Sequence, residues 1–513
     1  MPGRYGFPGG LRLLGQRDLS SGHESVDAGI PERLYLPLRQ HIGLPARPLV
    51  VPGDRVARGQ AIAVADGYVS VTLHAPTSGW IRALQSHPVV RPGSSHETCI
   101  VLEADGEDRL CPDLRIGVPA TPEGLLQRLA EAGLVGMGGA GFPAHVKLCE
   151  ARTQRVDTLI INAVECEPYI TCDDRLLREQ AATVVAGARL LQRALEAERC
   201  LLAVEEDMPL AWEALQQVDL DGVEPVRVPT LYPAGGERQL IRMLTGRILP
   251  RGGLPASVGA LVHNAATAAA AWNAISTGLP LIERYVTVTG EVAQPGNYRV
   301  RLGTPVSWLL QRAGGARSDR LVMGGAMMGL PIHDLAAPVI KTSNCILALP
   351  ESETAPRPEA CIHCGECVRV CPAELQPQTL YRYAGSGDYD AIQDFHLFDC
   401  IECGCCDYVC PSHIPLAGSF RNAKQEINAQ DRRQQDAEAA RRRYQRRQQR
   451  LARQQRAVAE RRQRQAVERP EAGARPGRQS LQQRQVFIQE AVRRSRARRA
   501  RRPATDDNGD GEE

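Results

Sequence analysis

Two stretches decide the fold of the C-terminal part of the chain: CIHCGECVRVCP at residues 361–372 and CIECGCCDYVCP at residues 400–411. Each stretch spaces four cysteines as Cys-x2-Cys-x2-Cys-x3-Cys and ends on a proline. That proline stops any helix that carries the fourth cysteine. Zinc sites usually combine two well-separated Cys-x2-Cys pairs, so four cysteines packed this closely argue against zinc. The pattern favours a cluster with several sulfur ligands.

The spacing predicts two [4Fe-4S] clusters, as in bacterial two-cluster ferredoxins, where the fourth cysteine of each run binds the cluster of the other run. Small residues such as Gly365 and Gly404 leave room for the sulfides. We expect Cys405 not to be a ligand, because its neighbours fit the spacing better. The expected ligands of the first cluster are Cys361, Cys364, Cys367 and Cys410, and those of the second are Cys371, Cys400, Cys403 and Cys406.

Length and composition favour a multidomain redox protein. The chain has 513 residues, enough for three or four domains. No apolar run reaches 18 residues, so no transmembrane helix is expected. Residues 1–15 lack a signal-peptide pattern, which predicts a cytoplasmic location. Sixteen cysteines in such a protein favour metal or redox use over disulfides.

Charge is divided unevenly along the chain. The net charge is +3, but residues 431–502 carry +17 and residues 503–513 carry −5, which leaves −9 for the first 430 residues. An acidic body with a basic tail indicates a globular part with an accessory segment. The tail, residues 421–513, is rich in Arg, Gln and Ala, and we expect an isolated helix or disorder. Its charge suits anionic lipid or an acidic partner. Nucleic acid is not expected as a partner, because nothing in the body reads a base sequence.

Residues 1–115 are expected to form an all-β domain. Short Val-rich strands alternate with turns at residues 52–54 and 65–67. The stretches VPGDRVARGQ (51–60) and HAPTSGW (74–80) resemble a lipoyl or biotinyl carrier domain. Carriers place a modifiable Lys at a hairpin tip, and the tip near Asp66 and Gly67 offers no Lys. We therefore expect a structural or docking β-sandwich without a covalent cofactor.

Residues 116–282 predict a parallel α/β fold. Strands are expected at 157–164, 200–204 and 223–232, and helices at 176–198 and 237–244. Ligands of such sheets bind at the carboxyl ends of the strands. The Gly-rich loop at 136–141 could bind a phosphate there, with Lys147 as a cation. Tight packing is the alternative reading of a Gly-rich turn.

Four segments of this region together resemble the flavin- and NADH-binding subunit of respiratory complex I: the Gly-rich loop, NAVECEP (162–168), YPAGGE (232–237) and VHNAAT (262–267). The resemblance implies an FMN lodged by Gly136, Gly138, Gly139 and Gly141, with contacts from Lys147, Asn162 and Asn264. It implies that Phe142 stacks on the adenine of NADH, and that the acids near the flavin and nicotinamide are Glu165 and Glu167. It adds a further wall made of Tyr232, Gly235 and Glu237.

Four residues depart from the complex I pattern. Met137 replaces an Arg, Val164 an acid, Gly236 a Glu and His263 an Asn. These changes leave an alternative open, in which the flavin and NADH site is degenerate and the protein only docks and relays electrons. A flavin is nevertheless expected on chemical grounds. Hydride donors deliver two electrons together, whereas each cluster accepts one, so a converter is needed.

Residues 283–350 predict a second β-rich domain. Strands are expected at 285–291 and 298–300 around a turn at 294–297, with a helix at 306–312 that ends at Gly314 and Gly315. The stretch VTVTGEVAQPGNYRV (286–300) resembles the soluble-ligand-binding β-grasp domain. A structural or docking role is expected for it.

The order of the regions resembles the C subunits of the Rnf complex, called Rsx in enteric bacteria. That order is a lipoyl-like domain (1–115), a flavin fold (116–282), a β-grasp domain (283–350), a double-cluster module (351–420) and a charged tail (421–513). The resemblance implies a peripheral flavoprotein on the cytoplasmic face of the inner membrane. It would work with the other Rnf subunits in a translocase that passes electrons between NADH and ferredoxin and moves Na⁺ or H⁺. An NADH dehydrogenase acting alone is disfavoured by the docking-type domains and the tail.

Overall fold

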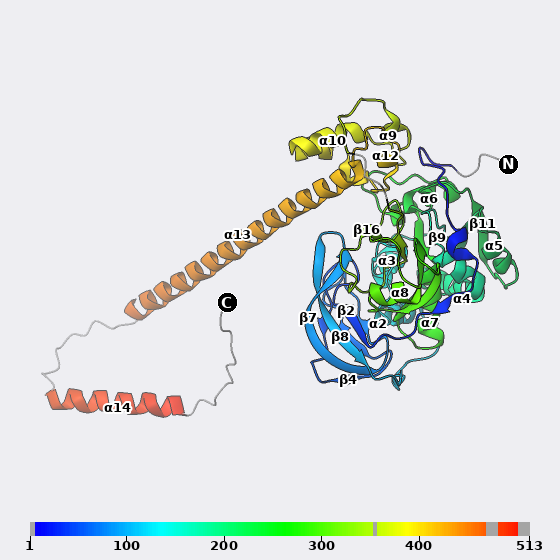
Figure 1. Cartoon of the computed structure of the whole chain (residues 1–513). Coiled ribbons are helices and arrows are strands. Elements are labelled where there is room, and N and C mark those ends of the chain that lie inside the picture. The colour runs from blue at the N-terminus through cyan, green and yellow to red at the C-terminus, as the bar shows by residue number, and fades with distance from the viewer. Residues whose placement is uncertain (1–5, 352–356, 468–480, 501–513) are drawn as a thin grey trace. The chain divides into compact units, whose positions relative to one another are not determined.

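A computed structural model describes residues 6–351, 357–467 and 481–500 (Figure 1). The chain divides into two compact units, residues 1–429 and 430–513. The acidic end of the sequence, residues 503–513, lies outside the described residues.

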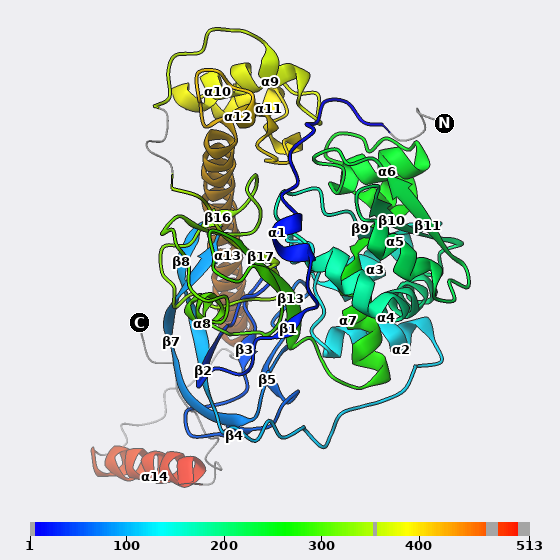
Figure 2. The ribbon, with the colours of Figure 1, turned by 45° about the vertical axis from the view of Figure 1, so that its right-hand side comes forward.

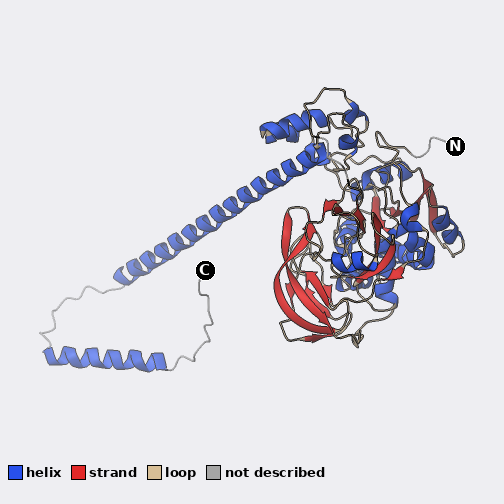
Figure 3. Cartoon of the chain, viewed as in Figure 1, coloured by secondary structure: helices blue, strands red, loops and turns tan. Residues whose placement is uncertain are grey.

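The N-terminal part of the first unit contains a sandwich of two antiparallel sheets, as its alternating strands and turns predicted (Figures 2 and 3). The loop between the last two short strands of the smaller sheet carries Asp66 and Gly67. The larger sheet has the order β2 (Arg33–Pro37), β8 (Ser94–Ala104), β7 (Gly79–Arg91) and β4 (Arg55–Val56), and the smaller has β3 (Arg47–Pro48), β5 (Ala61–Val64) and β6 (Leu73–His74).

The residues that precede the sandwich differ from the prediction of a single all-β domain over 1–115. Strand β1 (Val26–Asp27) pairs with β14 (Gly296–Arg301) in another sheet, and Leu11 forms a backbone bridge with Tyr232. A short helix, α1 (Asp18–Ser21), lies between these two contacts in sequence. These segments are too short to form a core of their own, so their backbone groups pair with edges that later parts of the chain supply.

The second part is a four-stranded parallel sheet in the order β11 (Val223–Val228), β10 (Arg199–Glu205), β9 (Thr158–Ala163) and β12 (Ala260–Asn264). All three predicted strands are present, but the third ends at Val228 and not at residue 232. Pro225 lies in this edge strand, where a missing backbone donor is tolerated. The helices of this part are α2 (Pro122–Glu131), α3 (Ala144–Thr153), α4 (Cys172–Leu195), α5 (Pro209–Gln216), α6 (Glu237–Thr245) and α7 (Ala265–Ser276), with the 3-10 turn η1 (Pro255–Val258).

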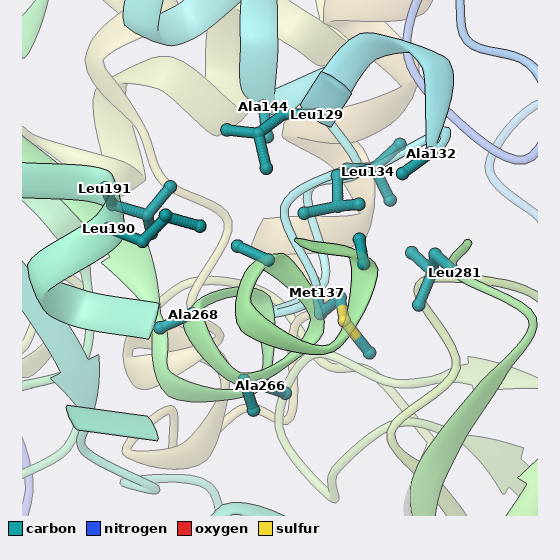
Figure 4. Close-up of a cluster of buried hydrophobic side chains, with 14 of the residues drawn as sticks. Leu129, Ala132, Leu134, Met137, Ala144, Leu190, Leu191, Ala266, Ala268 and Leu281 are labelled. Atoms are coloured by element: carbon teal, nitrogen blue, oxygen red, sulfur yellow. The ribbon is translucent and has the colours of Figure 1, made fainter. Parts of the chain in front are cut away.

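Two buried clusters cover the faces of this sheet because alternate residues of its strands point to opposite sides. Leu159 and Ile161 of β9 belong to one cluster, and Ile160 belongs to the other. Part of the larger cluster, where Leu190 and Leu191 of α4 lie near Ala268 of α7, is drawn in Figure 4. The helices α4 and α7 cross so closely that a Cβ at Gly187 would lie 1.8 Å from the Ala268 carbonyl oxygen.

The third part is a six-stranded mixed sheet in the order β1, β14, β13 (Glu283–Gly290), β17 (Cys345–Ala348), β15 (Leu321–Met323) and β16 (Leu330–Pro331). Helix α8 (Val306–Arg312) packs Val306, Leu309 and Leu310 into the same core as Val286 and Val300. The predicted strands and helix of this region are therefore confirmed, with Gly314 and Gly315 at positive φ after the helix.

The cysteine-rich part is built from two halves that repeat at an interval of 39 residues. Helix α9 (Glu366–Arg369) corresponds to α12 (Cys405–Tyr408), and α10 (Pro377–Ser386) corresponds to the start of α13 (Leu416–Val467). Between the halves lie α11 (Tyr389–Asp394) and the 3-10 turn η2 (Leu397–Asp399). Left-handed backbone conformations recur at the same interval, as at Gly365 and Gly404.

The first turns of α13 belong to the core of this part. Leu416, Phe420, Ala423 and Ile427 are buried with Leu380 and Ile392. The predicted start of the tail, residue 421, therefore falls inside a helix whose apolar face is already packed, and the first unit extends to residue 429. Composition alone misplaces this boundary, because it changes gradually here.

The described residues of the second unit are helical. They comprise the remainder of α13 and the helix α14 (Leu481–Ala500), and nearly all their assigned side chains are exposed. No helix in the described part of the chain is long and apolar enough to cross a membrane.

Candidate functional site

Two cavities lie in the cysteine-rich part, and each is lined by four of the cysteines that the spacing grouped together. Three cysteines of the first run meet the last cysteine of the second run, and apolar walls complete the cavity. Its lining includes Cys361, Cys364, Cys367, Cys410, Ile362, Tyr381, Ile414 and Leu416. Four thiols around one apolar hollow are the donor set that a [4Fe-4S] cluster takes.

The second cavity is the counterpart of the first. The last cysteine of the first run meets the three leading cysteines of the second run, so the exchange of the fourth cysteine works in both directions. Its lining includes Cys371, Cys400, Cys403, Cys406, Leu375, Leu380 and Phe420. Cys405 also lines this cavity and is fully buried. The structure thus gathers both expected ligand sets, with a fifth cysteine beside the second.

Backbone curvature around the cavities explains how four thiols converge. His363 and Glu402, which lie inside the first Cys-x2-Cys of each run, have φ values of 56° and 57°. Gly365 and Gly404 follow with φ values of 80° and 73°. Such left-handed residues turn the chain tightly, so that successive cysteines face one hollow. A Cβ at Gly365 would meet no heavy atom within 4 Å, which leaves space beside the first cavity.

The Gly-rich loop lies at the carboxyl edge of the parallel sheet, immediately before α3. It is closed by hydrogen bonds from the Gly136 N–H to the Phe142 oxygen (2.8 Å) and from the Gly141 N–H to the Gly136 oxygen (3.2 Å). Gly138 and Gly139 are exposed, and Gly139 has a φ of 111° with open space around its Cα. Exposed backbone without side chains suits close approach of a phosphate or sugar. Phe142 itself is half-buried.

Two asparagines at the ends of β9 and β12 lie next to this loop. Asn162 donates from Nδ2 to the Gly235 oxygen at 2.9 Å, and Asn264 donates from Nδ2 to the Asn162 oxygen at 3.4 Å and to the carboxylate of Asp173. Asn264 also caps α7 through Oδ1, and a Cβ at Gly138 would lie 3.3 Å from its Cβ. The fold therefore brings Gly138, Asn162, Gly235 and Asn264 together, as carboxyl ends of adjacent parallel strands should.

Lys147 lies in α3 with its ammonium already paired. Nζ donates to Glu237 Oε1 at 2.6 Å and to the Val262 oxygen at 2.7 Å. The structure thus joins two of the predicted site residues directly. The charge that the sequence assigned to a phosphate is balanced here by a carboxylate.

Glu165 is buried at the start of α4. Its carboxylate accepts hydrogen bonds from the backbone N–H groups of Asp173 (2.7 Å) and Asp174 (3.0 Å), which have no partner inside the helix. Burial, reinforced by the nearby charge of Asp173, raises the pKa of Glu165 to about 8. A carboxyl with that pKa can hold or release a proton near neutral pH.

Glu167 anchors the loop between β15 and β16 in the third part of the chain. Its carboxylate accepts from the backbone N–H groups of Met327 (3.0 Å) and Met328 (2.9 Å). Burial raises the pKa of Glu167 to about 7, although these two hydrogen bonds act in the opposite direction. Gly325 allows the approach, because a Cβ there would lie 2.2 Å from Glu167 Oε2.

Tyr232 is buried, and its hydroxyl is directed to the cysteine-rich part. It donates to the backbone oxygen of Cys403 at 2.6 Å, while its own backbone pairs with Leu11. It belongs to one apolar cluster with Cys166, Cys403 and Met327. The segment that the sequence placed in the flavin pocket therefore also contacts a cysteine that lines the second cavity.

Several residues at the site were missed by sequence reasoning. Arg17 forms ion pairs with the buried Glu205 and with Asp207 (3.3 Å), and it donates to the Glu165 oxygen. Gly9 has a φ of 67° and lies so close to Val370 and Cys371 that a Cβ would meet the Val370 oxygen at 2.6 Å. These contacts join residues more than a hundred positions apart. The adjacent glycines at positions 9 and 10 were the local feature that could have indicated a close approach of this segment to another part of the backbone.

Family models match the chain in the same order as its parts. Residues 5–107 match the RnfC barrel sandwich hybrid domain, and residues 129–273 match the Nuo51 FMN-binding domain. Residues 285–331 match the SLBB domain, and residues 356–435 match the 4Fe-4S dicluster domain. The chain is thus a mixed α/β multidomain protein with an FMN-binding domain and a domain for two [4Fe-4S] clusters.

Curated relatives share most of the chain. Each is named as the C subunit of an ion-translocating oxidoreductase complex, and each is 44% identical to this chain: those of Pseudomonas aeruginosa (87% of this chain, 58% of the relative), Erwinia tasmaniensis (86% and 56%) and Pasteurella multocida (86% and 54%). The chain therefore spans little more than half the length of these relatives. A crystal structure of an NAD⁺-reducing [NiFe]-hydrogenase is similar with a TM-score of 0.42 and 21% identity, over 60% of this chain and 61% of that one.

Proposed function

Because the chain belongs to the family of C subunits of ion-translocating oxidoreductase complexes, we propose that it is the NADH-oxidising subunit of such a complex. In this proposal NADH is oxidised at an FMN, and single electrons pass through two [4Fe-4S] clusters to partner subunits or a ferredoxin-type protein. The observation that carries the proposal is the pair of four-cysteine cavities in one compact unit with an FMN-binding fold.

The electron balance fits two clusters. NADH gives up two electrons and a proton to become NAD⁺, and each cluster accepts one electron, so the two sites together hold the pair. FMN, when bound, supplies the chemistry that divides the pair into single electrons. The released proton goes to solvent. Glu165 and Glu167 have raised pKa values of about 8 and about 7, so either carboxyl could accept this proton before it reaches solvent.

We assign the binding roles by position. The exposed backbone at Gly138 and Gly139 would accommodate the phosphate and sugar of FMN, and the side-chain amides of Asn162 and Asn264 would orient it. The cluster ligands would be Cys361, Cys364, Cys367 and Cys410 at one site, and Cys371, Cys400, Cys403 and Cys406 at the other. Cys405 would remain a buried thiol.

The setting of the subunit is also part of the proposal. A peripheral protein at the cytoplasmic face of the inner membrane would be held there by the other subunits of the complex. The basic second unit would add attraction to anionic lipid or to an acidic partner.

One observation favours a second candidate function, an electron relay without NADH activity. Lys147 is paired with Glu237 and with the Val262 oxygen, so it offers no free charge to a phosphate in this conformation. In that case the flavin fold would serve for docking only, and the clusters would receive electrons from another protein.

An anaerobic titration of the purified protein with NADH tests the proposal, with iron and FMN quantified beforehand. Bound FMN whose absorbance bleaches, followed by reduction of the clusters, would support the NADH-oxidising role. About eight irons with no flavin and no response to NADH would refute it and leave the relay. A Glu237→Gln variant serves as the comparison, because it removes the carboxylate charge that pairs with Lys147 and should raise FMN content if the pairing limits binding.

A further inference from the structure

The two cluster sites differ in how they are attached to the rest of the first unit. We infer that the second-run site (Cys371, Cys400, Cys403 and Cys406) is the inner site, which exchanges electrons with the flavin fold, and that the first-run site (Cys361, Cys364, Cys367 and Cys410) is the outer one. We infer further that Tyr232 and Lys424 are positioning residues of the inner site. This inference rests on the proposed function.

Contacts to the flavin fold gather at the second-run site. The Tyr232 hydroxyl donates to the Cys403 oxygen at 2.6 Å, and Gln239 donates to the oxygen of Pro372, next to Cys371, at 3.4 Å. Arg238 pairs with Asp399, adjacent to Cys400, at 3.5 Å. Three different ligand cysteines of this site are therefore held, directly or through a neighbour, by α6 and the segment before it.

A second connection runs through the β-grasp part. Glu167 follows β9 in the flavin fold and binds the backbone N–H of Met327. The Met327 oxygen in turn lies against Gly404, where a Cβ would be only 3.1 Å from it. Cys166, Met327 and Cys403 share one apolar cluster with Tyr232. Packed residues therefore connect Glu167, one of the proposed flavin carboxyls, to the loop of the second cysteine run without interruption.

The N-terminal segment closes the same site. Gly10 donates from its N–H to the Val370 oxygen at 3.0 Å, and Leu11 pairs with Tyr232. Gly9 packs on the backbone of Cys371 without room for a side chain. This segment therefore ties the first-run cysteine that serves the inner site to the flavin fold.

Lys424 adds a cation to the inner site. Its Nζ donates to the Cys400 oxygen at 2.6 Å and to Glu402 Oε1 at 2.9 Å, and Glu402 also pairs with Arg421. The chain has only three lysines among its 62 basic residues, Lys147, Lys341 and Lys424, and each donates to a backbone oxygen. The other Lys and Arg positions are all arginines, so lysine is rare in this chain and one of its three lysines lies beside a ligand cysteine.

The first-run site has the opposite character. Cys364 is exposed and Ile362 is 68% exposed, whereas Cys403 and Cys406 are buried. Among the residues that the structure describes, no hydrogen bond or ion pair joins residues 361–367 to residues 1–350. An exposed cluster edge suits transfer to another protein, whereas a buried one suits transfer within the chain. Electrons would therefore leave through the first-run site.

Tyr232 and Lys424 each donate to the backbone oxygen of a ligand cysteine, so the positive end of the Tyr232 hydroxyl dipole and the Lys424 ammonium lie beside the cluster site. Positive charge there favours the reduced, more negative cluster, so its loss should lower the potential. The test is an anaerobic redox titration of the holoprotein with mediators, followed by electron paramagnetic resonance. Tyr232→Phe and Lys424→Met should each lower the second-run cluster's reduction equilibrium constant several-fold, where tenfold corresponds to about 59 mV. Lys424→Arg keeps the charge and should therefore leave the potential of the second-run cluster close to its wild-type value. The clusters are told apart by the signals lost in Cys403→Ser and in Cys364→Ser.

Tyr381→Phe is the matched control, because Tyr381 lines the first-run cavity and should leave the second-run potential unchanged. A shift of the first-run cluster in Tyr232→Phe, or no shift with full iron content, would overturn the assignment of positioning residues. Stepwise ferricyanide treatment tests the exposure independently. It should destroy the first-run signal first, and earlier loss of the second-run signal would overturn the inner and outer order. Neither measurement uses NADH or flavin, so failure of the proposed function would appear separately.

Discussion

Replacing Glu167 with Gln should change how the loop at residues 324–329 responds to pH. When the loop opens, Glu167 becomes solvated and its pKa falls from about 7 towards the ordinary 4.5. A carboxyl whose pKa is raised in the closed state favours closure when protonated, and this contribution is lost as pH rises through the closed-state pKa. The difference between the closed-state and open-state pKa values lowers the free energy of loop closure by about 3 kcal/mol at most between pH 7 and pH 4.5. Glu167→Gln cannot ionise and should show no such dependence.

Hydrogen exchange of the peptide that contains Met327 and Met328 measures the opening, after correction for the intrinsic rate at each pH. The wild-type loop should open more readily at about pH 8 than at about pH 5, while the variant stays constant. Glu179→Gln is the matched control. Glu179 also accepts a backbone N–H, from Ser25 at 2.7 Å, but hydrogen bonds from Ser25 and Tyr285 outweigh burial and lower its pKa. The reasoning is refuted if wild type and Glu167→Gln share one pH profile, or if the wild-type loop becomes better protected as pH rises.

Three further predictions concern cofactor content and the tail. Cys371→Ser should remove about four of roughly eight irons and abolish the second-run cluster signal, whereas loss of the first-run signal would contradict the exchanged ligands. Gly139→Val forces a β-branched residue to a φ of 111°, so FMN content should fall while iron content is kept, and unchanged FMN would remove this loop from the flavin site. Deleting residues 430–513 should preserve iron and FMN, since the first unit ends at residue 429, and should weaken binding to anionic vesicles; lost iron would show the tail to be structural.

Regular elements with local signals were predictable. The buried run at 157–164 appears as β9, and the helix at 306–312 has the predicted bounds. The grouping of cysteines around two cavities agrees with the pattern of two-cluster ferredoxins that the spacing indicated. Hydrophobic pattern and residue spacing depend on residues close together in the sequence, so structure that forms locally could be predicted from them.

Contacts between distant segments were not predictable. Nothing near Tyr232 indicates that its hydroxyl meets Cys403, 171 residues later. Likewise, Glu167 was expected at the flavin, and its hydrogen bond to Met327 depends on how the third part, with its six-stranded sheet, packs on the part with the parallel sheet. The ion pair between Lys147 and Glu237 joins two residues that were each assigned to a ligand. Single-residue reasoning names polar groups but does not show which of them satisfy each other.

The exchange of the fourth cysteine between the two halves has a consequence for biosynthesis. Cys410, which closes the first-run cavity, is the last of the eight cysteines to leave the ribosome. A nascent chain that ends between the two runs would present Cys361, Cys364 and Cys367 without Cys410, and Cys371 without the cysteines of its own cavity, a state open to oxidation. With the ligand sets proposed above, iron and sulfide would be inserted fully only after translation has passed residue 410 and both halves have come together. Maturation of this module depends on the timing between chain synthesis and cluster delivery.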